Sequence, residues 1–250
     1  MPHKNRVEVV ELNYRKRILG YSIFYVCVFA VLIVASFATN HVTDVLSKSR
    51  LSDYRQCIVL DAGHGGVDGG AISCTGARES VINLEICIRL QDLFHLLGYD
   101  TKMIRTDDVS IHTQGDTIAS KKVSDLKERV RIINETENAL LISIHQNHFQ
   151  ESRYHGAQIF YNSNKHSEEL AGQIQAAFVR TVNAGSNRKA KKSSGVYLME
   201  HVSCCAVLVE CGFLSNPAEE AMLRDANYQK SICCVIASSV SNFLDVETND

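Results

Sequence analysis

The 250-residue sequence contains no tryptophan and only two prolines, Pro2 and Pro217, so it has no proline-rich linker. Its formal net charge of −2 at pH 7 gives no support for nucleic-acid binding, and it carries no motif typical of modules that bind DNA or RNA. We therefore expect no nucleic acid among its partners. It also lacks an internal repeat of about 20–50 residues, which argues against solenoid and propeller folds.

The cysteines lack the spacing of a metal site or a disulfide framework. Nine is an odd number, and no two of them form a C-x-x-C pair of the kind that binds zinc. Most lie in apolar runs, where a free cysteine behaves as a small buried hydrophobe. With 45% hydrophobic and 22% charged residues, the chain is expected to form one sizeable globular domain.

Residues 18–39 form a run of 22 residues without a charged side chain. As a helix this run would span about 30 Å, the thickness of the hydrocarbon core of a bilayer. Lysines and arginines precede it and few follow it, which predicts that the N-terminus stays inside and the remainder lies outside. A cleaved secretory signal is the alternative, because Ser36-Phe37-Ala38 resembles a cleavage site.

The predicted organisation therefore has four parts. They are a cytoplasmic tail at 1–17, a transmembrane anchor or signal segment at 18–39, a linker at 40–56 and a catalytic domain at 57–250. The domain is expected on the extracytoplasmic side of the cell membrane, or secreted if the segment is cleaved.

Three short apolar runs each end in a side chain that can bind a metal or carry a proton. The first leads into the glycine-flanked His64, the second ends in His145 and the third ends in Glu210. Such runs predict buried strands. Because open α/β sheets bind ligands beyond the carboxyl ends of their strands, we expect the three side chains to lie at one edge of a sheet.

Helical and extended patterns alternate along the rest of the chain. The predicted strands lie near 57–61, 99–105, 139–145, 156–161, 196–199 and 206–209, and the predicted helices cover 79–97, 123–137, 165–183, 217–225 and 228–244. This alternation predicts an α/β fold, a three-layer sandwich with a twisted, largely parallel sheet flanked by helices, behind one N-terminal transmembrane helix.

His64, Glu79 and His145 are candidate metal ligands, because two imidazoles, one carboxylate and a water complete a catalytic zinc site. Glu79 starts a helix after a glycine-rich loop, which lets it fold back over the sheet edge. It could equally be a carboxylate favoured by the helix dipole. Glu210 is the candidate general base, and Asp61 is a candidate to orient an imidazole.

Other interpretations of single residues stay open. His64 could be only a turn residue, and Glu210 only a surface acid at a strand end. His148 competes as a ligand, although its closeness to His145 in a bending chain disfavours joint ligation. The basic loop at 188–192 is expected to be solvated, although it could contact an anionic wall polymer.

Four segments resemble the zinc-dependent N-acetylmuramoyl-L-alanine amidases. They are IVLDAGHGG from Ile58, ESVINL from Glu79, SIHQN from Ser143 and VLVECGFLSNP from Val207. The resemblance covers about residues 55–244 in the family's order, with Ala62 where the family usually has proline. A compact domain behind a single apolar segment is most similar to the spore-cortex, germination-type amidases.

The resemblance implies Zn²⁺ on His64, Glu79 and His145, with Glu210 catalytic. It implies hydrolysis of the amide between the lactyl group of N-acetylmuramic acid and L-alanine of the peptidoglycan stem peptide, for spore-cortex maturation through muramic lactam. The implied partners are peptidoglycan, the membrane through the N-terminal helix, and an activating protein.

Two other functions stay open at this stage. The first is an envelope zinc peptidase or de-N-acetylase, although the H-E-x-x-H helix of zincins is missing. The second is a non-catalytic, membrane-anchored protein that binds the cell wall. The presence of all the candidate ligands and the candidate base argues against this second function.

Overall fold

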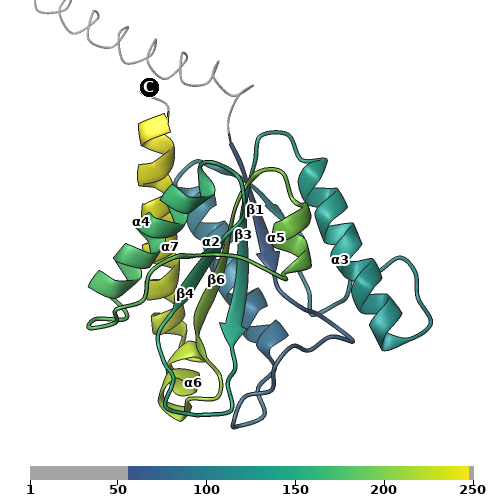
Figure 1. The fold of residues 1–250 in the computed structure, drawn as a ribbon, viewed down its shortest axis with the longest axis horizontal. Coiled ribbons are helices and arrows are strands. Elements are labelled where there is room, and N and C mark those ends of the chain that lie inside the picture. Colours follow the sequence, from purple (N-terminus) through teal and green to yellow (C-terminus); the bar gives the residue numbers. More distant parts are fainter. Residues whose placement is uncertain (1–55, 248–250) are drawn as a thin grey trace, which may run out of the picture. The chain divides into compact units, whose positions relative to one another are not determined.

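Hydrogen bonds join the strands into one sheet with the order β2-β1-β3-β6-β4-β5 (Figure 1). The computed structural model describes residues 56–247, and all statements about the fold refer to them. The strands are β1 (Cys57–Ala62), β2 (Asp100–Met103), β3 (Ala139–Asn147), β4 (Gln158–Tyr161), β5 (Lys191–Lys192) and β6 (Cys205–Phe213). The β1, β2, β3 and β6 strands run parallel, and only the pairing of β4 with β6 is antiparallel. The predicted largely parallel sheet is confirmed.

Helices cover both faces of this sheet. They are α2 (Glu79–Leu96), α3 (Ile118–Asn134), α4 (Ser167–Arg180), α5 (Tyr197–His201), α6 (Pro217–Leu223) and α7 (Ala226–Glu247). In Figure 1, α2, α4 and α7 lie on one side of the sheet and α3 and α5 on the other. The predicted three-layer α/β sandwich is confirmed.

Alternation along the strands divides the core between these two layers. In β1, Ile58 and Leu60 pack in the larger apolar cluster with α2, α4 and α7. Val59, which points the other way, packs in a smaller cluster with α3 and α5. This division follows from the two-residue period of a strand.

Two predicted elements need correction. The helix expected from residue 123 begins at Ile118, because Thr117 and Ser120 form a capping box inside a stretch that appeared to be a polar loop. The strand expected near 196–199 is the short helix α5. A short apolar run cannot by its pattern alone be assigned to a strand or to one helical turn.

The predicted tail and anchor, and nearly all of the linker, lie outside the described residues. Within residues 56–247 no helix is both long enough and apolar enough to span a bilayer. The eight cysteines of this part are all free thiols. Four of them are buried as expected, whereas Cys74 and Cys234 are exposed, so the predicted burial is confirmed for half of these cysteines.

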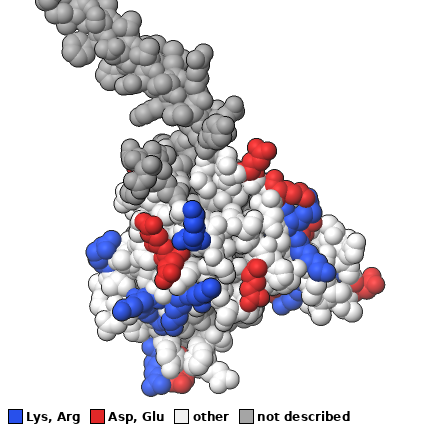
Figure 2. Space-filling view, turned by 45° about the horizontal axis from the view of Figure 1, so that its top comes forward, with Lys and Arg blue, Asp and Glu red and all other residues white. Residues whose placement is uncertain are grey.

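Charged side chains of both signs are spread over the face shown in Figure 2, and several lysines and arginines lie close together at its lower left. At the edge of the sheet, β5 consists only of Lys191 and Lys192, and both are exposed. A short, charged edge strand disfavours pairing with the sheet of another molecule. Contact between this basic segment and an anionic polymer stays a prediction.

Candidate functional site

The loop that carries His64 leaves β1 in an unusual backbone conformation. His64 has a φ of 63°, a left-handed value that is uncommon for residues other than glycine. Two arginines with almost fully buried side chains hold this conformation. Arg129 donates to the carbonyl oxygens of Ala62 (3.0 Å) and His64 (2.7 Å), and Arg105 donates to those of Ala62 (2.9 Å) and Gly63 (3.1 Å).

Strand register places His145 and Glu210 beside each other. His145 on β3 is the direct partner of Glu210 on the neighbouring β6, and an irregularity in the register follows immediately after His145. On the other side of β3, the amide of Gly63 donates to the carbonyl of Ile144 at 3.0 Å, which ties the loop after β1 to the same edge. The carboxyl ends of β1, β3 and β6 therefore lie side by side at one edge of the sheet, as predicted.

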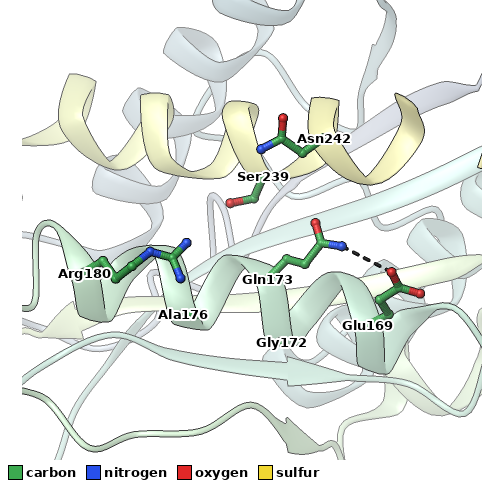
Figure 3. Close-up of a pocket in the computed structure, with 7 residues that line it drawn as sticks. All are labelled: Glu169, Gly172, Gln173, Ala176, Arg180, Ser239 and Asn242. Carbon is green, nitrogen blue, oxygen red and sulfur yellow. Dashed lines mark hydrogen bonds between the residues drawn. The ribbon is translucent and has the colours of Figure 1, made fainter. Parts of the chain in front are cut away.

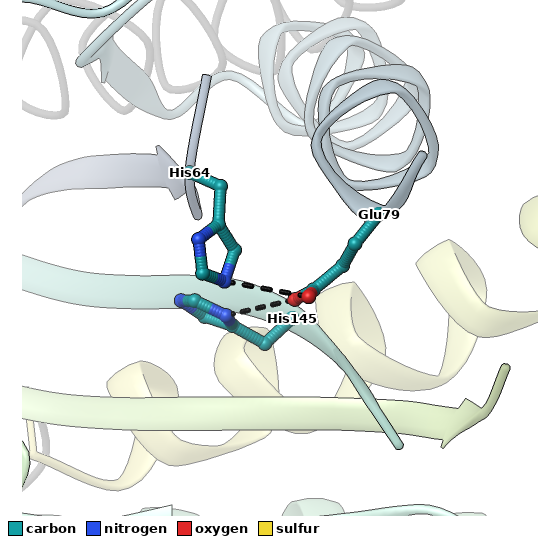
Figure 4. A group of neighbouring side chains, drawn as sticks. All are labelled: His64, Glu79 and His145. Atoms are coloured by element: carbon teal, nitrogen blue, oxygen red, sulfur yellow. Dashed lines mark hydrogen bonds and ion pairs between the residues drawn. The ribbon is translucent and has the colours of Figure 1, made fainter. Parts of the chain in front are cut away.

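Glu79 lies in the first turn of α2 and reaches back to both imidazoles (Figure 4). Its carboxylate oxygens lie 3.3 Å from His64 Nε2 and 3.1 Å from His145 Nδ1. One ligand atom from each of the three residues lies within 4.8 Å of the others. Ligand atoms on a tetrahedral zinc with bonds of about 2.0–2.1 Å are roughly 3.3 Å apart, so the three residues fit such an ion.

Glycines make room for this group. A Cβ atom at Gly63 would lie 2.2 Å from Nε2 of His145, and one at Gly70 would lie 2.5 Å from a carboxylate oxygen of Glu79. Because real Cβ contacts are never so short, larger residues at these positions would displace the ligand side chains. The glycines around the histidine loop are therefore part of the site.

The second nitrogen of His64 has a carboxylate partner that sequence reasoning missed. Asp68 Oδ2 lies 3.0 Å from His64 Nδ1, and Lys122 holds the other oxygen of Asp68 at 2.8 Å. Such a partner fixes the ring orientation of a metal ligand. The only feature of the sequence that could have indicated this pairing is the position of Asp68, four residues after His64 in a glycine-rich turn.

The role predicted for Asp61 is wrong. Its carboxylate pairs with the guanidinium of Arg129 and accepts a hydrogen bond from Ser143 at 2.6 Å, rather than orienting an imidazole. Asp61 lies on the strand itself and points towards α3, whereas the ring nitrogens of His64 lie beyond the strand end. Burial would raise the pKa of Asp61, but the charge of Arg129 and the Ser143 bond outweigh it and lower the pKa.

Electrostatics at the three-residue group favour a cation. Burial alone would raise the pKa of Glu79, but hydrogen bonds from His145 and His64 outweigh it and hold the pKa far below its usual value. Burial alone would lower the pKa of His64, but its bonds with Glu79 and Asp68 raise it to about 9. The carboxylate is therefore ionised, and in the metal-free protein a proton on His64 balances part of its charge.

Glu210 lies beside this group and has the properties of a proton acceptor. Burial raises its pKa to about 7, and the negative charge of Glu79 adds to this effect while the two imidazoles oppose it. Among the described residues, its buried Oε2 has no hydrogen-bond partner. A carboxylate that titrates near neutral pH and has a free oxygen can take up and release a proton during a reaction.

A cavity of about 300 Å³ opens over these residues, between the sheet, α3 and the segment leading into α5. His64, His145 and Glu210 line it beside an apolar wall formed by Leu126, Val196, Leu198 and Leu208. His148, the competing ligand, is exposed in the loop after β3 and is not part of the His–Glu–His group.

A second groove, of about 430 Å³, lies between α4 and α7 on the opposite layer (Figure 3). Its lining includes Glu169, Gln173 and Arg180 but no histidine or cysteine. It therefore offers no comparable set of metal ligands, and the cavity on the α3 side is the one that can bring a substrate to the candidate site.

Comparisons with known proteins match most of the described residues to one family. Residues 58–242 match the family model described as N-acetylmuramoyl-L-alanine amidase. The germination-specific N-acetylmuramoyl-L-alanine amidase of Bacillus subtilis (strain 168) is 36% identical over 190 residues, which is 74% of this chain and 78% of that protein. The N-acetylmuramoyl-L-alanine amidase AmiA of Escherichia coli (strain K12) is 26% identical over 240 residues, 78% of each protein.

Among solved structures, the CwlD amidase from Clostridioides difficile, in complex with the GerS lipoprotein, is similar with a TM-score of 0.74 and 37% identity. The match covers 77% of this chain and all of that one. An N-acetylmuramoyl-L-alanine amidase from Clostridium difficile 630 has a TM-score of 0.67 and 27% identity, over 77% of this chain and 98% of that one.

Proposed function

This chain belongs to the N-acetylmuramoyl-L-alanine amidase family, and from this we propose the bond that it cleaves, the metal that it uses and the residues that act. It is an amidase of peptidoglycan. The bond is the amide between the lactyl group of N-acetylmuramic acid and L-alanine of the stem peptide. The observation that carries the proposal is the His64, Glu79 and His145 group beside the unpaired oxygen of Glu210.

We propose that the metal is zinc, held by His64, Glu79 and His145. Two imidazoles and a carboxylate are a common ligand set of catalytic zinc, and their spacing here suits its bond lengths. When bound, zinc supplies a positive charge that polarises the amide carbonyl and lowers the pKa of the attacking water. Asp68 keeps the His64 ring in the orientation that ligation requires.

Glu210 is the proposed general base and acid. Its carboxylate takes a proton from the attacking water and returns it to the nitrogen of L-alanine as the amide bond breaks. Burial supports this role, because a pKa of about 7 lets the same group be ionised before the attack and protonated before the leaving group departs. The apolar wall beside it reduces access of bulk water.

We also propose that the enzyme acts in the spore cortex, at the step that prepares muramic acid for conversion to muramic lactam. The similarity to a germination-specific amidase supports this role. The anchor at 18–39, which would place the domain outside the cell membrane, stays a prediction. An activating protein is a further proposal, supported by the similar amidase whose structure was solved with a lipoprotein.

Digestion of purified peptidoglycan, with and without a chelator, tests the reaction. We expect the full chain to release intact stem peptides and to leave glycan free of peptide, identified by mass spectrometry. A chelator should abolish this release, and added zinc should restore it. A peptidase would instead cut within the stem peptide. Full release of stem peptides by a verified metal-free protein would refute the proposal that the reaction requires a metal ion.

Two substitutions separate the proposed roles of the glutamates. Glu210→Gln keeps the size of the side chain but removes the base, so zinc content should stay near wild type while turnover falls by about two to four orders of magnitude. Glu79→Ala removes a ligand, so zinc content and turnover should fall together. Elemental analysis beside peptide release gives the test, and the opposite pattern of zinc loss would mean that the roles are exchanged.

A further inference from the structure

The loop between β3 and β4 exposes two aromatic side chains beside the candidate site. Phe149 is 48% exposed and Tyr154 is 36% exposed. No other phenylalanine or tyrosine is exposed in the part of the chain that the structure describes. An exposed aromatic pair next to a catalytic group is a typical feature of a ligand-binding surface. We call this pair the aromatic ledge.

The two rings of the ledge are packed against each other and supported from beneath. Their centroids are 4.9 Å apart in an edge-to-face arrangement. The Tyr154 ring also stacks on the buried ring of Phe213, with centroids 6.3 Å apart and planes 28° from parallel. Arg188 covers Phe213 at 5.2 Å from the ring centroid. Such contacts fix ring orientation.

Hydrogen bonds to the segment leading into α6 (Figure 1) hold the loop backbone in place. The Phe149 amide donates to Ser215 Oγ at 3.1 Å, and the Asn216 side chain donates to the Tyr154 carbonyl at 3.3 Å. The buried carboxylate of Glu219 accepts from the amides of Gly156 and Phe213, both at 2.8 Å. The ledge is thus a pre-formed surface, and its rings lose little freedom when a ligand binds.

The ledge lies at the same end of β3 and β6 as His145 and Glu210. Phe149 lies just after the end of β3, four residues after His145, and Phe213, the ring that supports Tyr154, is three residues after Glu210 on β6. At about 3.3 Å per residue, three residues of strand span roughly 10 Å. The proposed substrate bond is attached through the lactyl group to a sugar ring, so a glycan strand must pass within this distance of Glu210.

We infer that the aromatic ledge binds the glycan strand of peptidoglycan by stacking on sugar rings, an inference that rests on the proposed function. The apolar faces of pyranose rings pack well on aromatic rings. The charge pattern also favours the neutral glycan over the stem peptide with its carboxylates. Arg153 lies over one face of the Tyr154 ring, 5.4 Å from its centroid, and pairs with Glu151 at 2.7 Å, so its charge is balanced. Because this arginine is exposed, it can swing aside when a sugar ring stacks on that face. The stem peptide then takes the cavity lined by the apolar wall and Lys122.

Binding of peptide-free glycan strands to the full chain, measured by calorimetry, tests the ledge without any need for turnover. Replacing both rings (Phe149→Ala with Tyr154→Ala) should weaken glycan binding about tenfold or more, because each stacked ring contributes a few-fold to affinity. The matched control is Leu96→Ala, which removes a side chain that is 82% exposed at the end of α2. This control should bind glycan as the wild type does.

Kinetics give a second measurement. The double variant should raise KM for polymeric peptidoglycan while kcat and zinc content stay near wild type, and its KM for a short N-acetylmuramoyl peptide should change less. Phe149→Tyr with Tyr154 intact keeps an aromatic ring at this position and should bind glycan as the wild type does. If the double variant does not fold, Phe149→Ser alone, at a half-exposed position, should still weaken glycan binding.

Unchanged glycan affinity in a folded ledge variant would overturn the inference, and so would loss of affinity for free stem peptide in its place. Failure of the proposed function has a different signature. In that case the wild-type chain would release no stem peptides, whatever its affinity for glycan.

Discussion

Glu210 should make the metal-free protein less stable at neutral and alkaline pH, and Glu210→Gln should remove this cost. The buried carboxyl has a pKa of about 7 in the folded protein, against 4.5 when unperturbed. At 1.36 kcal/mol for each pKa unit, this rise in pKa corresponds to a loss of about 3 kcal/mol in the free energy of unfolding once Glu210 is ionised. The cost arises because burial takes the ionised group out of water without giving its Oε2 a partner.

The sign of the pH dependence follows from proton binding. Between pH 4.5 and about 7 the folded protein holds a proton on Glu210 that the unfolded chain releases, so stability from this group falls as the pH rises. The glutamine variant has no such titration. The two proteins should differ least below pH 4.5, and the variant should gain about 3 kcal/mol relative to wild type above pH 8.

Urea unfolding of both chelator-treated proteins at pH 5 and pH 8, followed by circular dichroism, measures this difference. Comparing the change between the two pH values cancels the titrating groups that do not interact with Glu210. Zinc-loaded protein is a matched control, because a cation beside Glu210 favours the ionised form and should shrink the gain. A stability difference that does not change between the two pH values would refute the reasoning.

Three further substitutions test the surroundings of the ligands. Asp68→Asn should weaken zinc binding by about 10–100-fold, measured by competition with a chelator, and unchanged affinity would mean that Asp68 does not orient His64. Gly63→Ala places a Cβ 2.2 Å from the His145 ring, so zinc content should fall; a variant that keeps full zinc would contradict this contact. Arg129→Leu leaves two buried carboxylates without their partner and should destabilise the domain by about 3–5 kcal/mol in urea unfolding. A loss below about 1 kcal/mol would show that the network is dispensable.

The sheet edge that carries the site was predictable because it depends on local pattern. Apolar runs that end in His64, His145 and Glu210 predict buried strands, and parallel strands bring their carboxyl ends together. The structure places these residues as expected. Glu79 was harder to assign, because a carboxylate in the first turn of a helix has an ordinary explanation in the helix dipole.

The supports of the site could not be predicted, because charged residues are normally exposed. Arg105 and Arg129 reach carbonyls of the His64 loop across about 40 and 65 residues of sequence, and no local pattern encodes contacts over such separations. The sequence did contain one partial signal. Lys122, Asp125 and Arg129 follow helical spacing, which places all three on the same face of α3.

The two faces of the sheet have consequences for how this protein can change over evolutionary time. The layer of α2, α4 and α7 covers the larger apolar cluster, so most substitutions there should lower the amount of folded protein. The layer of α3 and α5 covers a smaller cluster and borders the cavity. New substrate preferences can therefore be acquired through residues of this second layer while the first continues to supply most of the folding free energy.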